Sequence, residues 1–506
     1  MIRLIDHFLD RITMYRLVLY YLIILIVAAV ALSFAGVLPY DPYALMFSTA
    51  FFVAVCWITN EVFARTFRVP ANVESVYISA LILVLIVDPL SGVHDLVFMG
   101  WMAVLAMASK YILTINRKHI FNPVAFAVAV TALTINQSAT WWVGTAAMMP
   151  FVLIGGILIV RKIRRFDLVL SFLLATLAIS LVLTLLAGNN LLTTAQEILL
   201  QSPLLFFAFV ILTEPLTTPP TDKLRVLYGV LVGVFFSPQV HFGAIYFTPE
   251  LSIVIGNVFS YLVSPKAKLV LRLKERIHIA PDVYDFIFQP NRKLAFAPGQ
   301  YMEWTLGHAH PDSRGNRRYF TLASAPTEDE LRVGVKFYDN SSSYKQSMLK
   351  MDSGTEIVAG QLAGDFTLPG DLRQKCVFIA GGIGITPFRS MIKYLLDKRQ
   401  RRPIVLFYVN RTVSEIVYRD VFDKAQQLLG IKTIYVLTDK TKVPTGWQAR
   451  AGYVDARMIR TEVPDYLNCI FYLSGPNKMI ESYEDVLTGM GVPREHIKVD
   501  FFPGLV

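Results

Sequence analysis

Cysteine is scarce in this sequence of 506 residues, which contains three: Cys56, Cys376 and Cys469. They lie far apart, and none belongs to a Cys-x-x-Cys pair or to a ferredoxin-like run of cysteines. This spacing excludes a disulfide framework and a self-contained iron–sulfur cluster. We therefore expect no metal site, and any one-electron carrier has to be organic or supplied by a partner.

Charged residues are also few, at 17% of the chain against 54% hydrophobic residues, and the mean hydropathy is positive at +0.49. The apolar excess lies almost wholly before residue 265, which predicts a polytopic membrane domain over residues 1–265 and a soluble part after it. The formal net charge is +10, but Lys and Arg are spread over membrane helix ends and a mixed-charge second half. They indicate positive-inside topology and no nucleic-acid partner.

Apolar runs in the first half predict a multi-pass α-helical membrane domain of about ten spans. Several runs are short for a bilayer, which is typical of half-helices or breaks that neighbouring protein stabilises. The runs are 17–37, 42–63, 74–90, 95–113, 122–136, 148–161, 167–187, 202–213, 225–240 and 249–263.

Basic residues occur in every second connection between these runs, whereas the intervening connections carry almost none. An even number of spans then places the N- and C-termini on the cytoplasmic side of the cell's plasma (inner) membrane. The basic connections hold Arg65, Arg68, Lys110, Arg117, Lys118, Arg161, Lys162, Arg164, Arg165, Lys223 and Arg225.

Three stretches interrupt the apolar pattern with Pro, Gly or polar side chains. Residues 116–123 open one span and residues 213–221 close another, both on the predicted cytoplasmic side, while residues 139–147 form an outer loop with two tryptophans. Such breaks free backbone groups that need partners, and they often line a cofactor or ion site. Ordinary helix ends and an interfacial tryptophan belt are the alternatives.

The second half changes its pattern near residue 371. Residues 266–370 consist of short β-type runs with turn signals, which predict a small antiparallel β-barrel. From residue 371 to 506, β-type runs such as 376–380 and 404–408 alternate with helical segments, which predicts a doubly wound parallel α/β domain.

One motif lies in the predicted barrel, from Arg318 to Ser324, and places a cation, an aromatic ring and a hydroxyl on one edge. An Arg binds pyrophosphate through paired hydrogen bonds, an aromatic ring stacks on an isoalloxazine, and the Thr321 hydroxyl is placed to hydrogen-bond near the flavin N5. These residue types in this order indicate an FAD site. A barrel strand with an exposed Arg is the alternative.

Two further motifs follow predicted strands of the α/β domain. A glycine loop (Gly381, Gly382, Gly384, Thr386 and Pro387) opens a helix, where bare backbone approaches a pyrophosphate and the helix N-terminus stabilises its charge. A Gly-Pro turn (Ser474, Gly475, Pro476 and Met479) leaves room for a nicotinamide ring to reach a flavin. The chain then closes with Asp500 and Phe501, which are suited to cover the flavin ring or simply belong to a last strand.

Together, over roughly 240 residues, these motifs resemble the ferredoxin–NADP reductase superfamily. The resemblance implies an FAD-binding barrel over 266–370 and an NAD(P)H-binding domain over 371–506. It assigns FAD phosphate to Arg318, flavin stacking to Phe320, the N5 contact to Thr321, and the nicotinamide cofactor to the glycine loop and the Gly-Pro turn. Thr321 and Ser474 are the catalytic candidates. The cofactor-binding set is completed by Tyr319, Ser324, Lys336, Ser343, Asp500 and Phe501.

Two positions depart from the family pattern, and a third bears on the donor. Phe320 stands where tyrosine is usual, and Ser474 stands where cysteine is common near the hydride path. Arg411 follows the next strand, where it either pairs with a 2′-phosphate or is an exposed loop cation. NADH and NADPH therefore both stay open, with a slight preference for NADH.

The first half resembles the membrane flavoprotein subunit shared by the sodium-pumping NADH:quinone reductase and the Rnf complex. The likeness rests on the span number, the helix start at 121–123, the loop at 214–219 and the outer loop after the fifth span. In that family a threonine in a Ser-Gly-Ala-Thr pattern carries covalent FMN. Here the text is Val143-Gly144-Thr145-Ala146, so Thr145 is the nearest candidate and a dissociable flavin remains the alternative.

These resemblances imply an NAD(P)H-dependent flavin oxidoreductase in the lipid bilayer. Electrons would pass from NAD(P)H through FAD to a membrane-domain flavin, FMN or another, and then to a quinone or an extracytoplasmic acceptor, with further electron-transfer subunits as candidate partners. Two other classes remain open. A haem-containing metalloreductase needs paired axial histidines, and His94, His119 and His241 show no such spacing. A redox-sensing ion transporter needs a charged path, and the spans carry few charges.

Overall fold

The computed structural model describes residues 5–6, 8–9, 12–67, 73–115, 118–243, 245–264, 268–308, 311–312, 315–439, 441 and 450–500. It divides into two compact units, and the division between them falls between Lys268 and Leu269. We refer to residues up to Lys268 as the first unit and to those from Leu269 as the second unit, and each is described by itself.

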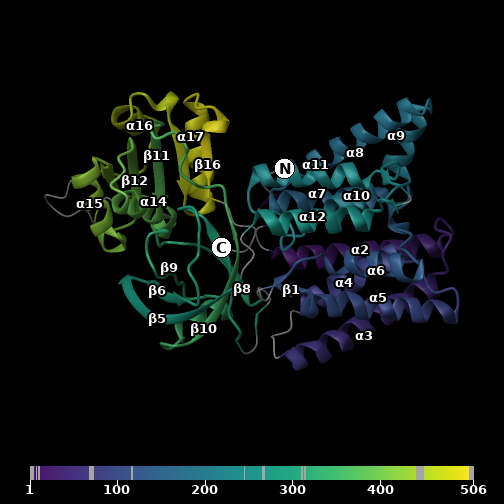
Figure 1. Ribbon diagram of the computed structural model, residues 1–506. Helices are drawn as coiled ribbons and strands as arrows, with labels where there is room; N and C mark the ends of the chain where they lie inside the picture. The colour runs from purple at the N-terminus through teal and green to yellow at the C-terminus, as the bar shows by residue number, and fades with distance from the viewer. Residues whose placement is uncertain are drawn as a thin grey trace. The chain divides into compact units, whose positions relative to one another are not determined.

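The first unit is helical (Figure 1, purple to teal). Its longer helices are α2 (Met14–Phe34), α3 (Pro42–Phe67), α4 (Val73–Ile86), α5 (Val93–Ile112), α6 (Pro123–Ile135), α7 (Met149–Ile163), α8 (Phe166–Leu186), α9 (Leu191–Leu200), α11 (Asp222–Phe236) and α12 (Pro249–Val263). The short helix α10 (Leu204–Phe206) continues as a π-helical turn over Phe207–Ile211. Two hairpins, β1 (Thr114–Ile115) with β2 (Lys118–His119) and β3 (His241–Phe242) with β4 (Ile245–Tyr246), join helices.

Each of the ten predicted apolar runs contains a helix, and α9 is a further helix that the runs did not include. Within the part of the chain that the structure describes, four helices, α2, α3, α5 and α8, are long and apolar enough to cross a membrane. A fifth crossing is available if α9 and Leu204–Ile211, bent by 55°, form one broken span. The other apolar helices have 15 residues or fewer, about 23 Å of helix against a hydrocarbon core of about 30 Å. A multi-pass helical domain is thus supported, whereas the number ten is not.

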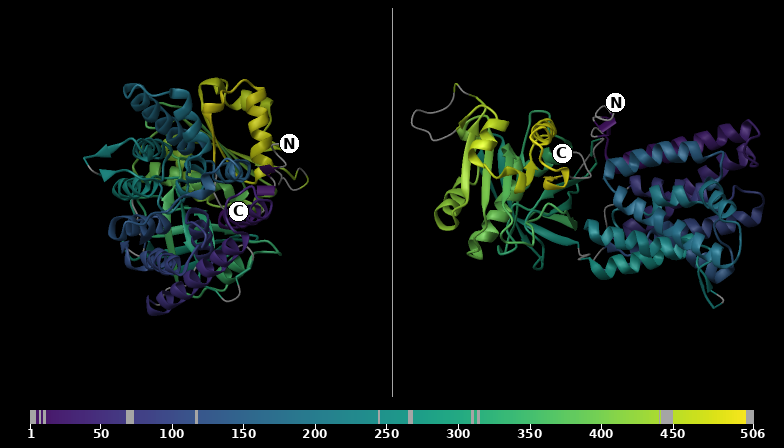
Figure 2. Two further views of the ribbon diagram at one scale, coloured as in Figure 1. Left: turned by 90° about the vertical axis from the view of Figure 1, so that its right-hand side faces the viewer. Right: turned by 90° about the horizontal axis from the view of Figure 1, so that it is seen from above.

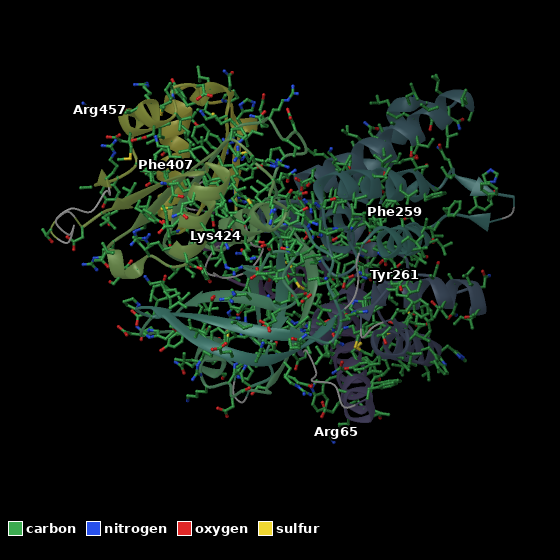
Figure 3. The ribbon with its side chains drawn as sticks, turned by 60° about the vertical axis from the view of Figure 1, so that its left-hand side comes forward. Arg65, Phe259, Tyr261, Phe407, Lys424 and Arg457 are labelled. Carbon is green, nitrogen blue, oxygen red and sulfur yellow. The ribbon has the colours of Figure 1, made fainter. Side chains whose placement is uncertain are left out.

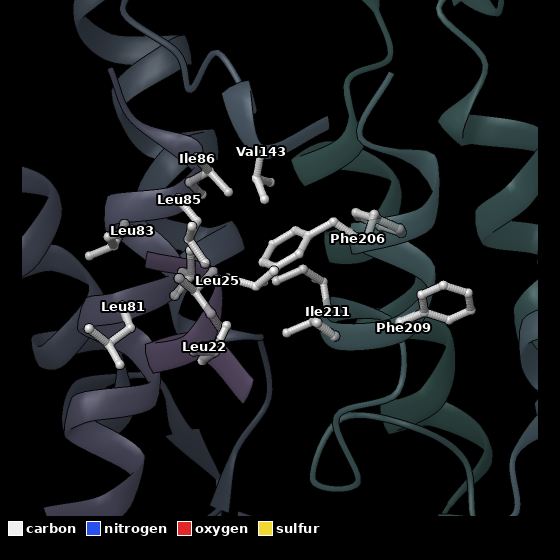
Figure 4. Packing of buried hydrophobic residues seen from close by; sticks show 14 of the residues in the cluster. Leu22, Leu25, Leu81, Leu83, Leu85, Ile86, Val143, Phe206, Phe209 and Ile211 are labelled. Carbon is white, nitrogen blue, oxygen red and sulfur yellow. The ribbon is translucent and has the colours of Figure 1, made fainter. Parts of the chain in front are cut away.

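The core of the first unit is made of aliphatic and aromatic side chains from helices distant in sequence. Figure 4 shows Leu22 and Leu25 of α2 and Ile86 of α4 close to Val143 of the loop between α6 and α7 and to Phe206 of α10. The outward faces are apolar as well: on α2, Ile23, Ile24 and Val27 are exposed. A helix that is apolar on all sides is typical of one surrounded by lipid.

The second unit begins with a six-stranded antiparallel sheet that we call the barrel. Its strands are β5 (Leu269–Ala280), β6 (Val283–Pro290), β7 (Tyr301–Thr305), β8 (Arg317–Thr321), β9 (Leu331–Lys336) and β10 (Glu356–Ala363), in the order β8-β7-β10-β5-β6-β9. Alternate residues point inward, where Phe286, Phe288 and Trp304 are fully buried with Tyr344 of α13 (Ser343–Leu349).

A six-stranded parallel sheet follows, as the alternation of strands and helices predicted. Its strands are β11 (Cys376–Gly381), β12 (Ile404–Asn410), β13 (Lys432–Leu437), β14 (Arg450–Ala451), β15 (Ile470–Ser474) and β16 (Ile497–Val499), in the order β14-β13-β12-β11-β15-β16. The order therefore reverses between β11 and β15. Ligands of doubly wound sheets bind at the carboxyl ends of the strands at such a switch point.

Helices cover both faces of this sheet (Figure 2). On one face, residues such as Phe378 pack against α14 (Thr386–Asp397) and α15 (Arg419–Leu429). On the other face, the alternate residues, including Phe407, pack against α16 (Ala456–Glu462) and α17 (Asn477–Gly489). Figure 3 labels the buried Phe407 together with exposed Lys424 of α15 and Arg457 of α16. Because every residue of β11 is buried, its strand reads as a continuous apolar run.

Candidate functional site

Strand β8 carries the first predicted motif at one end of the barrel sheet, where it pairs with β7. The buried Arg318 donates a hydrogen bond from Nη1 to the Gly315 carbonyl at 3.3 Å, and its guanidinium lies 5.0 Å from the centre of the Tyr344 ring. Phe320 lies on the same face, with ring centres 6.1 Å from Tyr344 and 6.5 Å from Trp304. The strand thus brings the cation and the aromatic ring together.

The alternate residues of β8 face the other way. Tyr319 donates its hydroxyl to Glu303 Oε2 at 3.0 Å, and its ring meets that of Tyr301 edge to face at 5.7 Å. Thr321 is buried at the end of the strand. The predicted motif therefore divides into two pairs, because side chains alternate along a strand.

The glycine loop continues directly from β11 through a 3₁₀ turn, Gly382–Ile385, into α14. A Cβ atom at Gly384 would lie 2.5 Å from the Ser474 carbonyl oxygen and 2.6 Å from the Gly475 nitrogen. Backbone therefore packs on backbone, and a side chain at Gly384 has no room. The glycine loop and the Gly-Pro turn, which lie about 90 residues apart in sequence, form one site.

The Gly-Pro turn ends β15, the parallel neighbour of β11, with Ser474 opposite Ala380. Gly475 has φ +156°, and a Cβ there would lie 2.5 Å from Met479 Cε. Pro476 caps α17 at its N-terminus, and Met479 covers the turn from the first part of that helix. Both predicted nicotinamide motifs therefore lie at the carboxyl ends of the two strands that flank the switch point.

Asp500 links this switch point to the barrel. Its backbone N–H donates to the Leu473 carbonyl at 2.9 Å, and the Ser474 hydroxyl donates to its Oδ2 at 3.0 Å. Burial raises the pKa of Asp500 to about 7, although hydrogen bonds from the Ser474 and Thr321 hydroxyls act to lower it. Thr321, Ser474 and Asp500 therefore lie together, and the Asp500 carboxyl group can gain or lose a proton near neutral pH.

The residues at this site fit FAD and a nicotinamide cofactor. The glycine backbone forms a cradle that a Cβ would fill, and α14 begins with Thr386 and Pro387 and no acidic residue in its first turn, as an anion-binding helix requires. Asp500 Oδ1 is buried with no hydrogen-bond partner among the described residues, so it is able to accept a hydrogen bond from the amide of a bound ring.

Other predicted residues lie elsewhere. Ser324 is buried, and its hydroxyl accepts a hydrogen bond from the Arg332 N–H at 3.2 Å. Lys336 lies at the end of β9, with its Nζ 6.0 Å from the centre of the Tyr338 ring. Ser343 starts α13, where its hydroxyl accepts from the Asp312 N–H at 2.9 Å. Arg411 is exposed after β12, and Phe501 lies outside the described residues.

Sequence reasoning missed four side chains that connect the barrel with the parallel domain. Arg389 of α14 forms an ion pair with Glu328 at 2.7 Å, and the Tyr418 hydroxyl donates to the buried Asp285. Arg389 lies two residues beyond Pro387, so its neighbourhood was in view, but its partner is 61 residues away. No local pattern identifies such a partner.

In the first unit, Thr145 follows the short turn Trp142–Gly144 in the loop between α6 and α7. Its Oγ1 is buried and has no hydrogen-bond partner among the described residues, which leaves a hydroxyl available for attachment. Trp141 and Trp142 are buried and donate to Glu250 and to the Val84 and Val87 carbonyls, respectively. Among the two interpretations of this loop, their burial disfavours an interfacial belt.

The two proline-broken stretches meet within the first unit. Asn122, which caps α6, donates from Nδ2 to Glu214 Oε2 at 2.8 Å, and the Thr217 hydroxyl donates to the same oxygen at 3.1 Å. His119 Nε2 lies 3.8 Å from Glu214 Oε1. The Asn122 N–H donates to Asn257 of α12 at 2.7 Å. We call His119, Asn122, Glu214, Thr217 and Asn257 the polar junction. Its hydrogen bonds connect the two proline-containing stretches to each other.

Two family models match this chain. Residues 143–268 match the NQR2, RnfD, RnfE family, and residues 378–485 match the oxidoreductase NAD-binding domain. The first match includes Thr145 and most of the polar junction, and the second includes the glycine loop and the Gly-Pro turn.

Curated relatives agree with the second match. The chain is 29% identical over 216 residues to the stachydrine N-demethylase reductase subunit of Rhizobium meliloti, covering 42% of this chain and 60% of that protein. It is 24% identical over 245 residues to a flavohemoprotein of Oceanobacillus iheyensis, covering 46% and 58%. The chain thus spans a little over half the length of these relatives.

Solved structures are similar at lower identity. The FAD/NAD-binding domain of nitric oxide dioxygenase from Vibrio cholerae is 20% identical with a TM-score of 0.40, covering 46% of this chain and 98% of that chain. The cytochrome b5 reductase domain of Ulva prolifera nitrate reductase is 22% identical with a TM-score of 0.41, covering 47% and 98%.

Both resemblances drawn from the sequence are confirmed by the family matches. The chain joins a membrane domain of the NQR2, RnfD, RnfE type to a ferredoxin–NADP reductase-like module, the NAD(P)H-dependent flavin oxidoreductase type whose cofactors are FAD and NAD(P)H.

Proposed function

We propose that this protein is a membrane-bound NAD(P)H dehydrogenase that moves electrons from NAD(P)H through FAD to a membrane-domain flavin, and from there to a quinone or an extracytoplasmic acceptor. The observation that carries the proposal is the meeting of Thr321, Ser474 and Asp500 at the switch point of the parallel sheet. Bound FAD would supply the conversion of a two-electron hydride donor into a source of single electrons.

Each residue at the site has a proposed task. Arg318 would bind FAD phosphate and Phe320 would pack on the flavin ring, because both lie on one face of β8. The bare backbone around Gly384 would bind the nicotinamide cofactor's pyrophosphate. Thr321 and Ser474 would orient the reacting rings, and Asp500 would hold or release a proton at its carboxyl group. The exposed Arg411 fits either an NADPH phosphate or solvent, so both donors remain in the proposal.

For the membrane domain, we propose that Thr145 is the attachment site for FMN, supported by its buried, unpartnered hydroxyl. The same proposal places both termini in the cytoplasm of a cell with the domain in its plasma membrane, and divides the chain at residues 265 and 370. About ten crossings remain part of the proposal, several of them by short helices that neighbouring protein would cover. Further electron-transfer subunits are proposed partners.

The first test uses the full chain purified in detergent under anaerobic conditions. Addition of NADH or NADPH should bleach the flavin absorbance, and quinone should restore it. A flavin spectrum that neither nucleotide bleaches contradicts the proposal. A Soret band in the purified protein would instead favour a haem-containing reductase.

The second test addresses the membrane flavin. A denaturing gel of the wild type should show a fluorescent band, and Thr145→Ala should remove it. Thr140→Ala is the matched control, because Thr140 lies in the same loop but already donates to Asp88 at 3.0 Å. Fluorescence that persists in Thr145→Ala excludes this residue as the attachment site, and a dark wild-type band leaves a dissociable flavin.

A further inference from the structure

The second unit contains a buried charged contact for which the proposed function has no task. Arg389 of α14 is 4% exposed and donates from Nη1 to the Ala323 carbonyl and to Glu328 Oε2, both at 2.7 Å, and from Nη2 to Glu328 Oε1 at 2.9 Å. The guanidinium therefore forms a bidentate contact with the carboxylate and also donates a hydrogen bond to a backbone carbonyl. Such a paired contact fixes direction as well as distance.

The segments that this contact joins are those that carry the cofactor motifs. Ala323 and Ser324 lie two and three residues after Thr321 of the FAD motif, and Arg389 lies two residues after Pro387, the last residue of the glycine loop. The next residue of α14, Ser390, donates its hydroxyl to the Ser324 carbonyl at 2.6 Å. The N-terminus of α14 is therefore held against the segment that follows β8 by four hydrogen bonds, two to backbone carbonyls and two to a carboxylate.

A second contact ties the same two parts at another place. Tyr418 precedes α15 in a left-handed conformation, with φ +56°, and its hydroxyl donates to Asp285 Oδ1 of β6. Asp285 is fully buried, and its other oxygen accepts from Arg332 Nη1 at 2.5 Å. Gly334 lies opposite Asp285 on β9, where a Cβ would lie 2.7 Å from the Tyr418 hydroxyl. The barrel thus leaves room for this tyrosine.

These contacts resist displacement for an electrostatic reason. Burial raises the pKa of the Glu328 carboxyl, but the Arg389 guanidinium outweighs it and holds that pKa below its ordinary value. The pair is therefore charged at neutral pH. Removing either partner would leave the other charge without its counter-charge in a largely buried place, which is strongly unfavourable.

We propose that Arg389 and Tyr418, with Glu328 and Asp285, form a latch that sets the position of the NAD(P)H-binding domain against the FAD-binding barrel. They are positioning residues, because they act through α14 and β8 and not on the reacting atoms. The inference rests on the proposed function: hydride transfer requires the two rings at about 3–3.5 Å, and an error of about 1 Å costs about 100-fold in rate.

The test compares Arg389→Lys and Tyr418→Phe with the wild-type full chain by rapid mixing with saturating NADH. Arg389→Lys keeps the charge but loses the bidentate contact with Glu328, so the limiting rate of flavin bleaching should fall about 10- to 100-fold. The NADH concentration at half-maximal rate should change less than about threefold, because no proposed binding residue is altered. Tyr418→Phe keeps the ring and should slow bleaching about 3- to 10-fold.

A readout apart from activity is hydrogen–deuterium exchange before nucleotide is added. In Arg389→Lys, backbone exchange should rise in residues 322–332 and 386–397 together, and FAD content should stay at the wild-type level. Arg419→Lys is the matched control, since its pair with Asp423 is exposed on α15, and it should leave both rate and exchange unchanged.

The outcomes separate the latch from the proposed function. A wild type that NADH or NADPH does not bleach overturns both. A wild type that bleaches, with Arg389→Lys equally fast, overturns the latch alone. Loss of FAD or of folded protein in Arg389→Lys, with Tyr418→Phe unaffected, makes Arg389 a structural residue and also overturns the latch.

Discussion

The two units gather their polar residues by different means. In the second unit, Thr321, Ser474 and Asp500 meet because strands end at one edge of a sheet. In the first unit, Asn122 and Glu214 meet because helices break there and the freed groups need partners. Strand order constrains a site much more tightly than helix breaks do. The sequence accordingly predicts which residues of the second unit lie together at a site, whereas for the first unit it offers only separate candidate stretches.

The largest expected effect concerns the second unit, where the glycine loop packs closely on the Gly-Pro turn. In Gly384→Ala the new Cβ would lie 2.5 Å from the Ser474 carbonyl oxygen, which is backbone and cannot turn aside. We expect the rate of bleaching by NADH to fall more than about 100-fold, because the glycine loop must separate from the Gly-Pro turn.

The measurement is flavin bleaching at a fixed NADH concentration, with FAD content determined in parallel. Gly489→Ala is the control, since a Cβ at that end of α17 meets no atom within 4 Å. Normal bleaching in Gly384→Ala would show that the close packing of the two motifs has no bearing on the nucleotide.

The next effect belongs to the first unit. Glu214→Gln keeps the shape of the side chain but removes the charge, which weakens the charge-assisted hydrogen bonds that Oε2 accepts from Asn122 and Thr217. We expect quinone reduction by NADH to fall about tenfold, while flavin bleaching without quinone stays within about twofold. Glu61→Gln, which alters an exposed pair with Arg65, serves as the control. A loss of bleaching equal to the loss of quinone reduction would erase the functional difference between the units.

The sequence predicted the parts of the fold that depend on local pattern. Apolar runs located the helices from α2 to α12 except α9, and the β-type runs 376–380 and 404–408 located β11 and β12, because buried segments consist of apolar residues. It could not predict how many helices cross the bilayer, since α6 and α12 are too short for length to decide. Nor did it find α9, whose apolar residues are interrupted by threonines and Glu197.

The candidate site was predictable to the same degree. The glycine loop and the Gly-Pro turn were each predicted to follow a strand, and the structure has them after β11 and β15, which are parallel neighbours. The contact of Tyr418 with Asp285 joins residues 133 positions apart. It depends on the way two sheets pack, and no local pattern expresses that. The same holds for the pKa of Asp500, which burial sets.

A smaller effect concerns the pH dependence that only the second unit should show. Burial raises the pKa of Asp500 from 3.8 to about 7, so the carboxylate forms as pH rises through about 7. A negative charge there would favour a bound nicotinamide ring in its cationic form, and we therefore expect the limiting rate of bleaching to rise over that range. Asp500→Asn should remove this rise between about pH 6 and 8. A rate in this variant that still rises with a midpoint near 7 would assign the titration to another group.

The same pKa shift has a consequence for stability. Because the folded protein holds the Asp500 proton more tightly than the unfolded chain does, this residue's contribution is full below about pH 4 and is lost as pH rises to about 7. Asp500→Asn should therefore be relatively more stable against urea at pH 8 than at pH 5, each compared with the wild type at the same pH. The opposite order would mean that the carboxyl is stabilised in its charged form.

The smallest effect tests whether the strand ends titrate as one group. Ser474 donates to Asp500 Oδ2 at 3.0 Å, and this bond lowers the pKa of the carboxyl. Removing the hydroxyl in Ser474→Ala should raise the midpoint of the pH–rate curve by less than about one unit, the equivalent of one hydrogen bond of about 1 kcal/mol. Thr145→Ala, in the first unit, should leave the midpoint unchanged. A midpoint that falls in Ser474→Ala would mean that the serine stabilises the neutral acid, and a midpoint that moves in Thr145→Ala would mean that the two units do not titrate independently.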